Sequence, residues 1–357
     1  MMLLQDNIFN QQRAPHQTKY KLWKSVGLML TYWCPCRCAC CYVGSAPDAA
    51  SPETEMSVEL ALDAWKGICD LAGHHASVHL TGGEPFGNFP RLETILRQAQ
   101  KARLTGLEKV ETNAYWATDD NITRRRLKTL RQLGLTRLQI STDVYHQQFV
   151  SFHNVKRAAR IAQEVLGPHA VQIRWRHFYQ NPIDTNSLTH PQRLQAFRQA
   201  LALRPERLVG RAADLLAPLL PLKNPKYFQN QNCSRHLLDA RHIHIDGHGN
   251  IFSGTCAGII LQKTTTSPKK SLPDIWKNFD IRQHPVLALL AEKGPAALLD
   301  IALPLGYQPL PAYASKCHLC YHLRRFLVHQ KHWPNHLGPA TCYPPPQKQP
   351  PQHPKNS

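Results

Sequence analysis

The chain lacks a long uninterrupted apolar segment. Across its 357 residues no run reaches the roughly 18 apolar residues that a membrane-spanning helix needs. The longest candidate, residues 286–305, is interrupted by charged residues and by Gly294 and Pro295. Asp6 falls within the first ten residues, before any apolar stretch forms, so we predict no signal peptide. We therefore expect a cytoplasmic protein without a membrane segment.

Acidic residues are scarce. The sequence has 24 Asp and Glu against 43 Lys and Arg, which gives a formal net charge of +19. Such an excess can indicate an anionic partner such as nucleic acid. However, the longest basic run is only residues 124–126, and the other basic residues are scattered. Charge alone therefore leaves nucleic acid as a minor alternative.

Cysteine, in contrast, is plentiful. The count of 11 is odd, so the cysteines of one chain cannot all pair in disulfides. Five of them crowd between Cys34 and Cys41, where the geometry of a disulfide would be strained. In a reducing compartment, clustered cysteines favour metal binding over disulfides.

Three of these cysteines have a spacing that suits an iron–sulfur cluster. Cys34, Cys38 and Cys41 form a C-x3-C-x2-C pattern directly after the apolar run at residues 26–33. A cubane 4Fe–4S cluster held by three thiolates keeps one iron without a protein ligand, and that iron can bind a substrate or cofactor. The residues alone leave a zinc knot or a patch of reactive thiols as alternatives.

The register of the pattern is well determined. Cys36 and Cys40 are also separated by three residues, but Val43 stands where their third ligand would fall. Only the register that starts at Cys34 is complete, so we assign Cys36 and Cys40 no ligand role.

From residue 26 to about residue 210 the chain alternates strand-like and helix-like segments. The predicted strands are residues 26–33, 77–80, 110–112, 138–141, 171–175 and 207–209, and the predicted helices are residues 57–71, 92–104, 123–133, 153–165 and 192–203. Such alternation predicts a parallel sheet with helical crossovers. Six units suit a partial (β/α)6 barrel better than a closed barrel of eight. The loops after the strands then form the functional face.

The cysteine triad, followed by LTGGEP after the second strand, resembles the radical S-adenosylmethionine (radical SAM) superfamily. This resemblance implies a radical SAM core at residues 25–212, after an N-terminal extension at residues 1–24. It also implies a 4Fe–4S cluster that reductively cleaves S-adenosylmethionine (AdoMet) to methionine and a 5′-deoxyadenosyl radical, which removes hydrogen from a substrate. The electron would come from a donor such as flavodoxin or ferredoxin.

The resemblance also implies candidate cofactor-binding residues. Glu84 of the GGEP segment is expected to accept a hydrogen bond from the AdoMet amino group, and Tyr42 is expected to pack on the adenine. The full candidate set is Tyr42, Gly82, Gly83, Glu84, Asn113, Ser141 and Asp143. His146 is a candidate for proton transfer. The sequence departs from the family at Cys40, where an aromatic residue is usual.

A second set of cysteines follows a connector at residues 213–232. Cys233, Cys256, Cys317 and Cys320 surround a predicted hairpin and end in C-x2-C, which resembles the auxiliary-cluster extension called SPASM or its shorter twitch form. Only five cysteines follow the core, which suffice for one four-cysteine 4Fe–4S cluster at residues 233–330, so we favour twitch and treat Cys342 as spare. A four-thiolate zinc site is the alternative. The Pro-rich tail, residues 331–357, is predicted to be disordered.

The sequence leaves the substrate open. A peptide and a small molecule are both compatible with a radical SAM enzyme that carries such an extension, whereas RNA rests on charge alone. The non-enzymatic alternative is a cysteine-rich zinc protein with a structural or partner-binding role. No residue that meets the substrate is identified.

Overall fold

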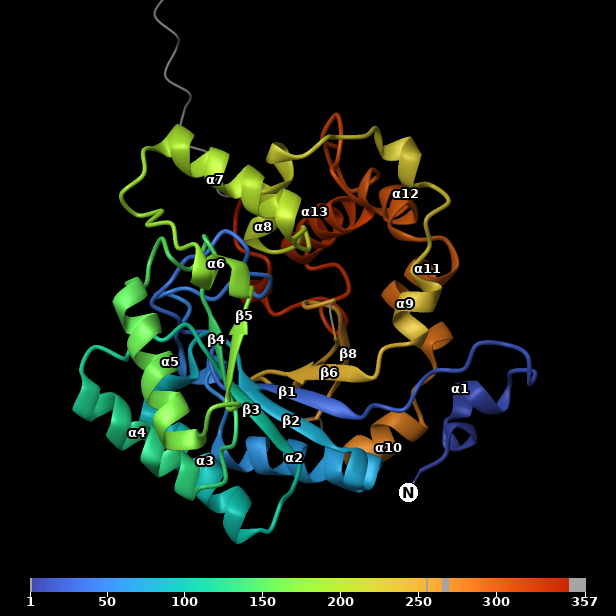
Figure 1. Ribbon diagram of the computed structural model, residues 1–357. Helices are drawn as coiled ribbons and strands as arrows, with labels where there is room; N and C mark the ends of the chain where they lie inside the picture. The colour runs from blue at the N-terminus through green and yellow to red at the C-terminus, as the bar shows by residue number, and fades with distance from the viewer. Residues whose placement is uncertain (1, 255, 265–269, 347–357) are drawn as a thin grey trace, which may run out of the picture.

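A computed structural model describes residues 2–254, 256–264 and 270–346 of the chain (Figure 1). Within these residues one sheet of eight strands runs in the order β5-β4-β3-β2-β1-β6-β7-β8. Neighbouring strands from β5 to β6 are parallel, and β7 and β8 continue the sheet antiparallel. The strands are β1 (Ser25–Met29), β2 (Ser77–Thr81), β3 (Leu107–Thr112), β4 (Leu138–Ser141), β5 (Val171–Arg174), β6 (His242–Ile245), β7 (Asn250–Ser253) and β8 (Ile260–Lys263).

Helices connect the parallel strands, and α2 to α5 cover one side of the sheet (Figure 1). The α-helices are α1 (Ile8–Gln11), α2 (Val58–Ala72), α3 (Phe89–Lys101), α4 (Asp120–Gln132), α5 (Phe152–Leu166), α6 (Arg176–Gln180), α7 (His190–Leu203), α8 (Arg211–Leu215), α9 (Ser234–Leu238), α10 (Leu272–Lys277), α11 (Pro285–Glu292), α12 (Leu299–Ala302) and α13 (Lys316–His329). Ser57, where the predicted helix 57–71 begins, caps α2, because its Oγ accepts a hydrogen bond from the Leu60 N–H at 3.1 Å. Among the described helices, none is both long and apolar enough to cross a membrane.

The two faces of the sheet differ in polarity. Val26, Leu28, Val78 and Leu80 are fully buried and alternate along β1 and β2, as expected for residues that pack under the helices. The alternate positions of β2 to β4 carry polar residues, which line a cavity: His79, Thr81, Glu111, Gln139 and Ser141. The prediction of a parallel α/β sheet in a partial barrel is confirmed. The inner face of this sheet carries polar side chains that suit a polar ligand, rather than a packed apolar core.

The sixth parallel strand is not where the sequence placed it. Residues 207–209 are irregular, and the chain turns at Gly210, whose φ is +59°. Leu208 and Val209 are buried as single side chains, which explains the strand-like apolar signal. The sixth parallel strand is instead β6, which pairs with β1. The segment with the second cysteine set is therefore hydrogen-bonded into the core sheet.

Part of the predicted tail is ordered. Leu337, Cys342 and Tyr343 are buried, and the Tyr343 hydroxyl donates a hydrogen bond to the Gly258 carbonyl at 2.7 Å. The prediction of disorder is therefore wrong for residues 331–346, where a few apolar residues between the prolines suffice for packing. Residues 347–357 lie outside the described residues.

Candidate active site and cysteine clusters

A cavity of about 620 Å³ lies at the polar face of the sheet, near the carboxyl ends of β1 to β5. This is the end of a parallel sheet where ligands bind, because the loops after the strands meet there. Its wall includes all five cysteines of the first loop, namely Cys34, Cys36, Cys38, Cys40 and Cys41. The structure therefore brings the predicted iron-binding loop to the predicted functional face.

The cysteine loop is buried and held close to the end of β3. Cys34 and Cys38 are 8 % and 5 % exposed, and the Asn113 side-chain N–H group lies 3.5 Å from the Cys34 Sγ. It also lies 3.4 Å from the Cys36 Sγ, so Cys36 shares this environment. A hydrogen bond with Cys36 and burial raise the pKa of Cys34, so the free thiol is protonated and a metal would have to displace the proton.

The spacing of the thiols favours a cluster over a single ion. A tetrahedral zinc with Zn–S bonds of about 2.3 Å needs sulfurs only ~3.8 Å apart. Among the described residues, three or more metal-ligating atoms come within 4.8 Å of one another in two groups, and neither is Cys34, Cys38 and Cys41. A 4Fe–4S cubane separates its thiolates over several irons, so the loop fits this group better than a single zinc ion.

Arg211 clamps the loop from the first turn of α8. This side chain is 2 % exposed, and its guanidinium donates hydrogen bonds to the carbonyls of Cys38 at 3.0 Å and Ser45 at 2.6 Å. The backbone N–H of Arg211 donates to the Cys41 carbonyl at 3.0 Å. Gly210 makes this approach possible, because a Cβ there would lie 2.3 Å from the Cys41 carbonyl oxygen. The clamp fixes the backbone on either side of Cys41.

Replacing Arg211 with alanine is expected to lower cluster retention by about 10–100-fold, the usual cost of losing a group that orients metal ligands. The two carbonyls would each lose a buried partner, at about 1–3 kcal/mol apiece. Iron per chain after anaerobic desalting measures the effect. The iron content of Arg211→Lys should lie between that of the wild type and that of Arg211→Ala, because an ammonium group cannot reproduce the two-pronged hydrogen bonding of a guanidinium. Arg97, whose side chain is 59 % exposed, gives the control Arg97→Ala. Full iron content in Arg211→Ala would contradict the clamp.

The GGEP segment packs directly on the strand-to-cysteine connection. The N–H groups of Gly83 and Glu84 donate to the carbonyls of Thr31 at 2.7 Å and Trp33 at 2.9 Å. A Cβ on Gly83 would lie 2.0 Å from the Trp33 carbonyl oxygen, so only glycine allows this contact. Gly82 and Gly83 line the cavity beside the cysteines. The segment thus presents backbone groups to the space in front of the cysteine loop.

Glu84 itself does not reach the cavity wall. Its carboxylate is fully buried and accepts hydrogen bonds from Thr112 Oγ1 at 2.8 Å, the Asn113 N–H at 2.7 Å and the Phe86 N–H at 3.2 Å. Burial raises its pKa to about 7 despite these bonds. Glu84 holds the loop after β3 in place, and its contact to AdoMet stays a prediction.

Asp143 likewise is not among the residues that line the cavity, and its contact to the cofactor stays a prediction. Its Oδ1 lies 2.8 Å from the His146 Nδ1 and accepts the backbone N–H groups of Tyr145 and His146. Although burial lowers the pKa of His146, Asp143 raises it overall. His146 is the member of the pair that lines the cavity, together with the predicted Tyr42, Asn113 and Ser141. Asp143 therefore orients a cavity residue.

Several cavity residues were missed by sequence reasoning. They are His79, Glu111, Arg174, Glu206, Arg211, His242 and His244. The alternation HIHI at residues 242–245 was a usable signal, because it places both histidines on one face of a strand. Their link to His79 depends on the pairing of β1 with β6, which no local pattern reveals.

Residues 28–167 match the family model described as the radical SAM superfamily. This part of the chain belongs to the radical SAM superfamily. The family implies an enzyme with a 4Fe–4S cluster and AdoMet, and the radical SAM match covers the cysteine triad, the GGEP segment, Asn113 and Ser141.

Solved structures similar to this chain include BtrN in complex with AdoMet and 2-DOIA, at 15 % identity and a TM-score of 0.43, covering 78 % of this chain and 90 % of BtrN. Another is native anSMEcpe with bound AdoMet, at 13 % identity and a TM-score of 0.42, covering 86 % of this chain and 97 % of the other. No curated protein sequence matches the chain.

The four cysteines of the second set also gather in space. Cys233 is the N-cap of α9, Cys256 follows β7, and Cys317 and Cys320 lie three residues apart near the start of α13. Burial, and then the charges of the other three thiols, raise the pKa of Cys233 to about 12, although Lys316 opposes this. Four thiols from distant segments therefore interact electrostatically at one place.

A buried arginine lies beside this second set. Arg324 is 2 % exposed, and its hydrogen bonds go to neutral groups, the Ala257 carbonyl at 3.0 Å and the Tyr343 hydroxyl at 2.5 Å. Burial raises the pKa of Cys320 to about 11, while Arg324 acts to lower it. A buried cation is costly unless it meets negative charge. A metal centre with four thiolates would supply that charge.

Proposed function

We propose that this chain is a radical SAM enzyme that cleaves AdoMet reductively and abstracts hydrogen from a substrate held in the same cavity. The observation that carries the proposal is that Cys34, Cys38 and Cys41 line one cavity with the backbone of Gly82 and Gly83. These three cysteines and two glycines lie within residues 28–167, the part of the chain that matches the superfamily. A zinc-binding structural protein would not require a cavity of this size in front of its cysteines.

In the proposed enzyme each cavity residue has a physical role. When bound, the 4Fe–4S cluster supplies the electron that cleaves AdoMet to methionine and a 5′-deoxyadenosyl radical. The three cysteines hold the cluster, and the exposed backbone of Gly82 and Gly83 binds the polar methionine end. Asn113 and Ser141 offer hydrogen bonds to the cofactor.

Two further side chains complete the cavity around the cofactor. Tyr42 provides an aromatic face for the adenine. His146, whose pKa Asp143 raises against the effect of burial, lines the cavity as the candidate for proton transfer.

The substrate in this proposal is a small molecule or a peptide side chain. A cavity of about 620 Å³ is in the range of small-molecule sites, ~300–1,000 Å³, and must also take the cofactor. The second cysteine set would hold an auxiliary twitch-type 4Fe–4S cluster that passes electrons, and a flavodoxin or ferredoxin in the cytoplasm would reduce the enzyme. Four protein ligands on that cluster leave it no open iron for the substrate.

Anaerobic purification followed by a cleavage assay tests the proposal. We expect a brown protein that contains iron and releases 5′-deoxyadenosine and methionine when AdoMet and a strong reductant are added. Chromatography of the products and metal analysis provide the measurements. A colourless protein that contains zinc, lacks iron and leaves AdoMet intact would overturn the proposed function.

A further inference from the structure

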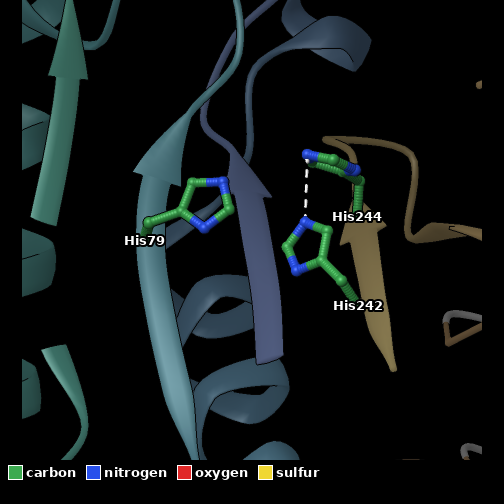
Figure 2. A group of neighbouring side chains, drawn as sticks. All are labelled: His79, His242 and His244. Carbon is green, nitrogen blue, oxygen red and sulfur yellow. Dashed lines mark hydrogen bonds between the residues drawn. The ribbon is translucent and has the colours of Figure 1, made fainter. Parts of the chain in front are cut away.

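Three histidines from two strands lie over the central strand of the sheet. In the strand register, Gly27 of β1 is paired with His79 of β2 on one side and with His244 of β6 on the other. His242 lies two residues before His244 on β6 and so shares its face. Figure 2 shows the three rings on either side of β1, with His79 facing the pair from β6. All three line the cavity that contains the cysteine loop.

Gly27 leaves a hollow between these rings. A Cβ at Gly27 would lie 2.7 Å from the His79 Nε2 and 2.9 Å from the His244 Nε2. Two ring nitrogens therefore face the space that any other residue at position 27 would fill. The ligand atoms offered by His79, His242 and His244 all lie within 4.8 Å of one another.

The spacing of the nitrogens suits a transition metal. The Nε2 atoms of His242 and His244 are 3.3 Å apart. A tetrahedral site with metal–nitrogen bonds of about 2.0–2.1 Å has its ligand nitrogens ~3.3–3.4 Å apart. The pair therefore already has the separation of two ligands on one ion. The His79 ring is stacked on His242 at a centroid distance of 5.1 Å and would have to reorient to join them.

Partners on the far side of the rings resemble those of metal-binding histidines. The His244 Nδ1 lies 3.0 Å from the Gly254 carbonyl oxygen, which can only accept, so Nδ1 carries the proton and Nε2 keeps its lone pair. The His242 Nδ1 lies 2.8 Å from the Ser25 hydroxyl. A partner that accepts from the second ring nitrogen fixes the tautomer that binds metal, as at His244. The His242 Nε2 donates to the His244 Nε2 in the metal-free chain, so metal binding would shift the His242 proton to Nδ1, where the Ser25 hydroxyl can accept it.

The charges around the rings also suit a cation. Burial lowers the pKa of His79 to about 4, of His242 to about 3 and of His244 to about 4, so all three are neutral at pH 7. Glu111 lies 4.0 Å from the His79 Nε2, beyond hydrogen-bonding distance but close enough to attract a cation there. The nearby Lys109 ammonium lies 3.5 Å from both Glu108 and Glu111, so two carboxylates outweigh it.

We propose that His79, His242 and His244 bind one divalent transition-metal ion, such as zinc, in the cavity wall. Three imidazoles leave a fourth position that opens toward the cavity, as in catalytic zinc sites. That position accepts an oxygen or nitrogen donor of the bound molecule. This role toward a substrate rests on the proposed function, whereas the metal site itself does not. The substrate class is then a molecule with a hydroxyl, carboxylate or amine that anchors it beside the site of radical formation.

Zinc binding to the full-length chain, purified anaerobically, tests the site without any activity assay. We expect zinc beyond the iron content, with an X-ray absorption spectrum at the zinc edge that shows nitrogen ligands at about 2.0–2.1 Å rather than sulfur at about 2.3 Å. His242→Gln should lose this zinc, and Ser25→Ala should weaken binding by about 10–100-fold through loss of the partner on His242.

Gly27→Ala is the sharpest variant because it keeps all three histidines. Its new Cβ would lie 2.5 Å from the His244 ring and displace it, so zinc should be lost while iron stays. The exposed His153 gives the control His153→Gln, which should bind zinc as the wild type does. Sulfur ligands alone in the zinc spectrum, or wild-type zinc in both Gly27→Ala and His242→Gln, would overturn the proposal. Failure of AdoMet cleavage with intact nitrogen-bound zinc would instead count against the proposed function only.

Discussion

Replacing Cys38 with alanine is expected to abolish AdoMet cleavage. A cubane needs all three thiolates of the loop, and two cannot hold it. The loss of cleavage activity should therefore exceed the 10–100-fold loss that follows removal of a group that only supports the ligands. Cys38 is 5 % exposed and its carbonyl is already fixed by Arg211, so the backbone of the loop should survive the change. Iron per chain and release of 5′-deoxyadenosine under reducing conditions measure the result.

Cys36 provides the matched control, and it is a demanding one. Its sulfur lines the same cavity and is as close to Asn113 as that of Cys34, at 3.4 Å against 3.5 Å. Only the sequence register excludes it, because Val43 cannot complete a triad with Cys36 and Cys40. Cys36→Ala should therefore keep iron and cleavage, with a stability cost of about 1 kcal/mol for one buried atom. If Cys36→Ala loses as much iron as Cys38→Ala, the assigned register is wrong.

The parts of the fold that follow from local chemistry were predictable. The strand at residues 138–141 has the bounds of β4, because Leu138 and Ile140 alternate with the polar Gln139 and Ser141 as expected of a strand. The start of α2 follows from the Ser57 cap. The order of the cysteine loop and the GGEP segment along the chain also predicts that both lie at one end of the sheet, since they follow neighbouring parallel strands.

Long-range pairing could not be predicted in the same way. Residues 207–209 and β6 both read as short strands, and only the ladder between β1 and β6 decides which one joins the sheet. The same ladder brings His79 beside His244, which are far apart in sequence. The hydrogen bonds of Glu84 could not be predicted for a related reason: the donors that hold its carboxylate come from Thr112 and Asn113, at the end of another strand.

Replacing Cys317 with alanine is expected to remove about four irons per chain, those of the auxiliary cluster, and to block substrate turnover. Cys317 and Cys320 face the same place from one turn of α13, and each acts on the pKa of Cys233. Loss of one thiolate leaves one metal atom of a four-thiolate site without its protein ligand. It also reduces the negative charge beside the buried Arg324. Because Cys34, Cys38 and Cys41 are untouched, 5′-deoxyadenosine should still form slowly without substrate turnover.

Cys342→Ala separates a ligand from a buried spare cysteine. Cys342 is 1 % exposed and its sulfur lies 3.5 Å from the Tyr32 hydroxyl. Like Cys317, it is a thiol of the C-terminal segment that packs against the rest of the protein. It should keep the full iron content. If Cys317→Ala releases zinc and no iron, the second set is a structural zinc site, and electron transfer through it is ruled out because zinc has no redox chemistry. Equal iron and equal zinc in the two variants and the wild type would remove the second set from metal binding altogether.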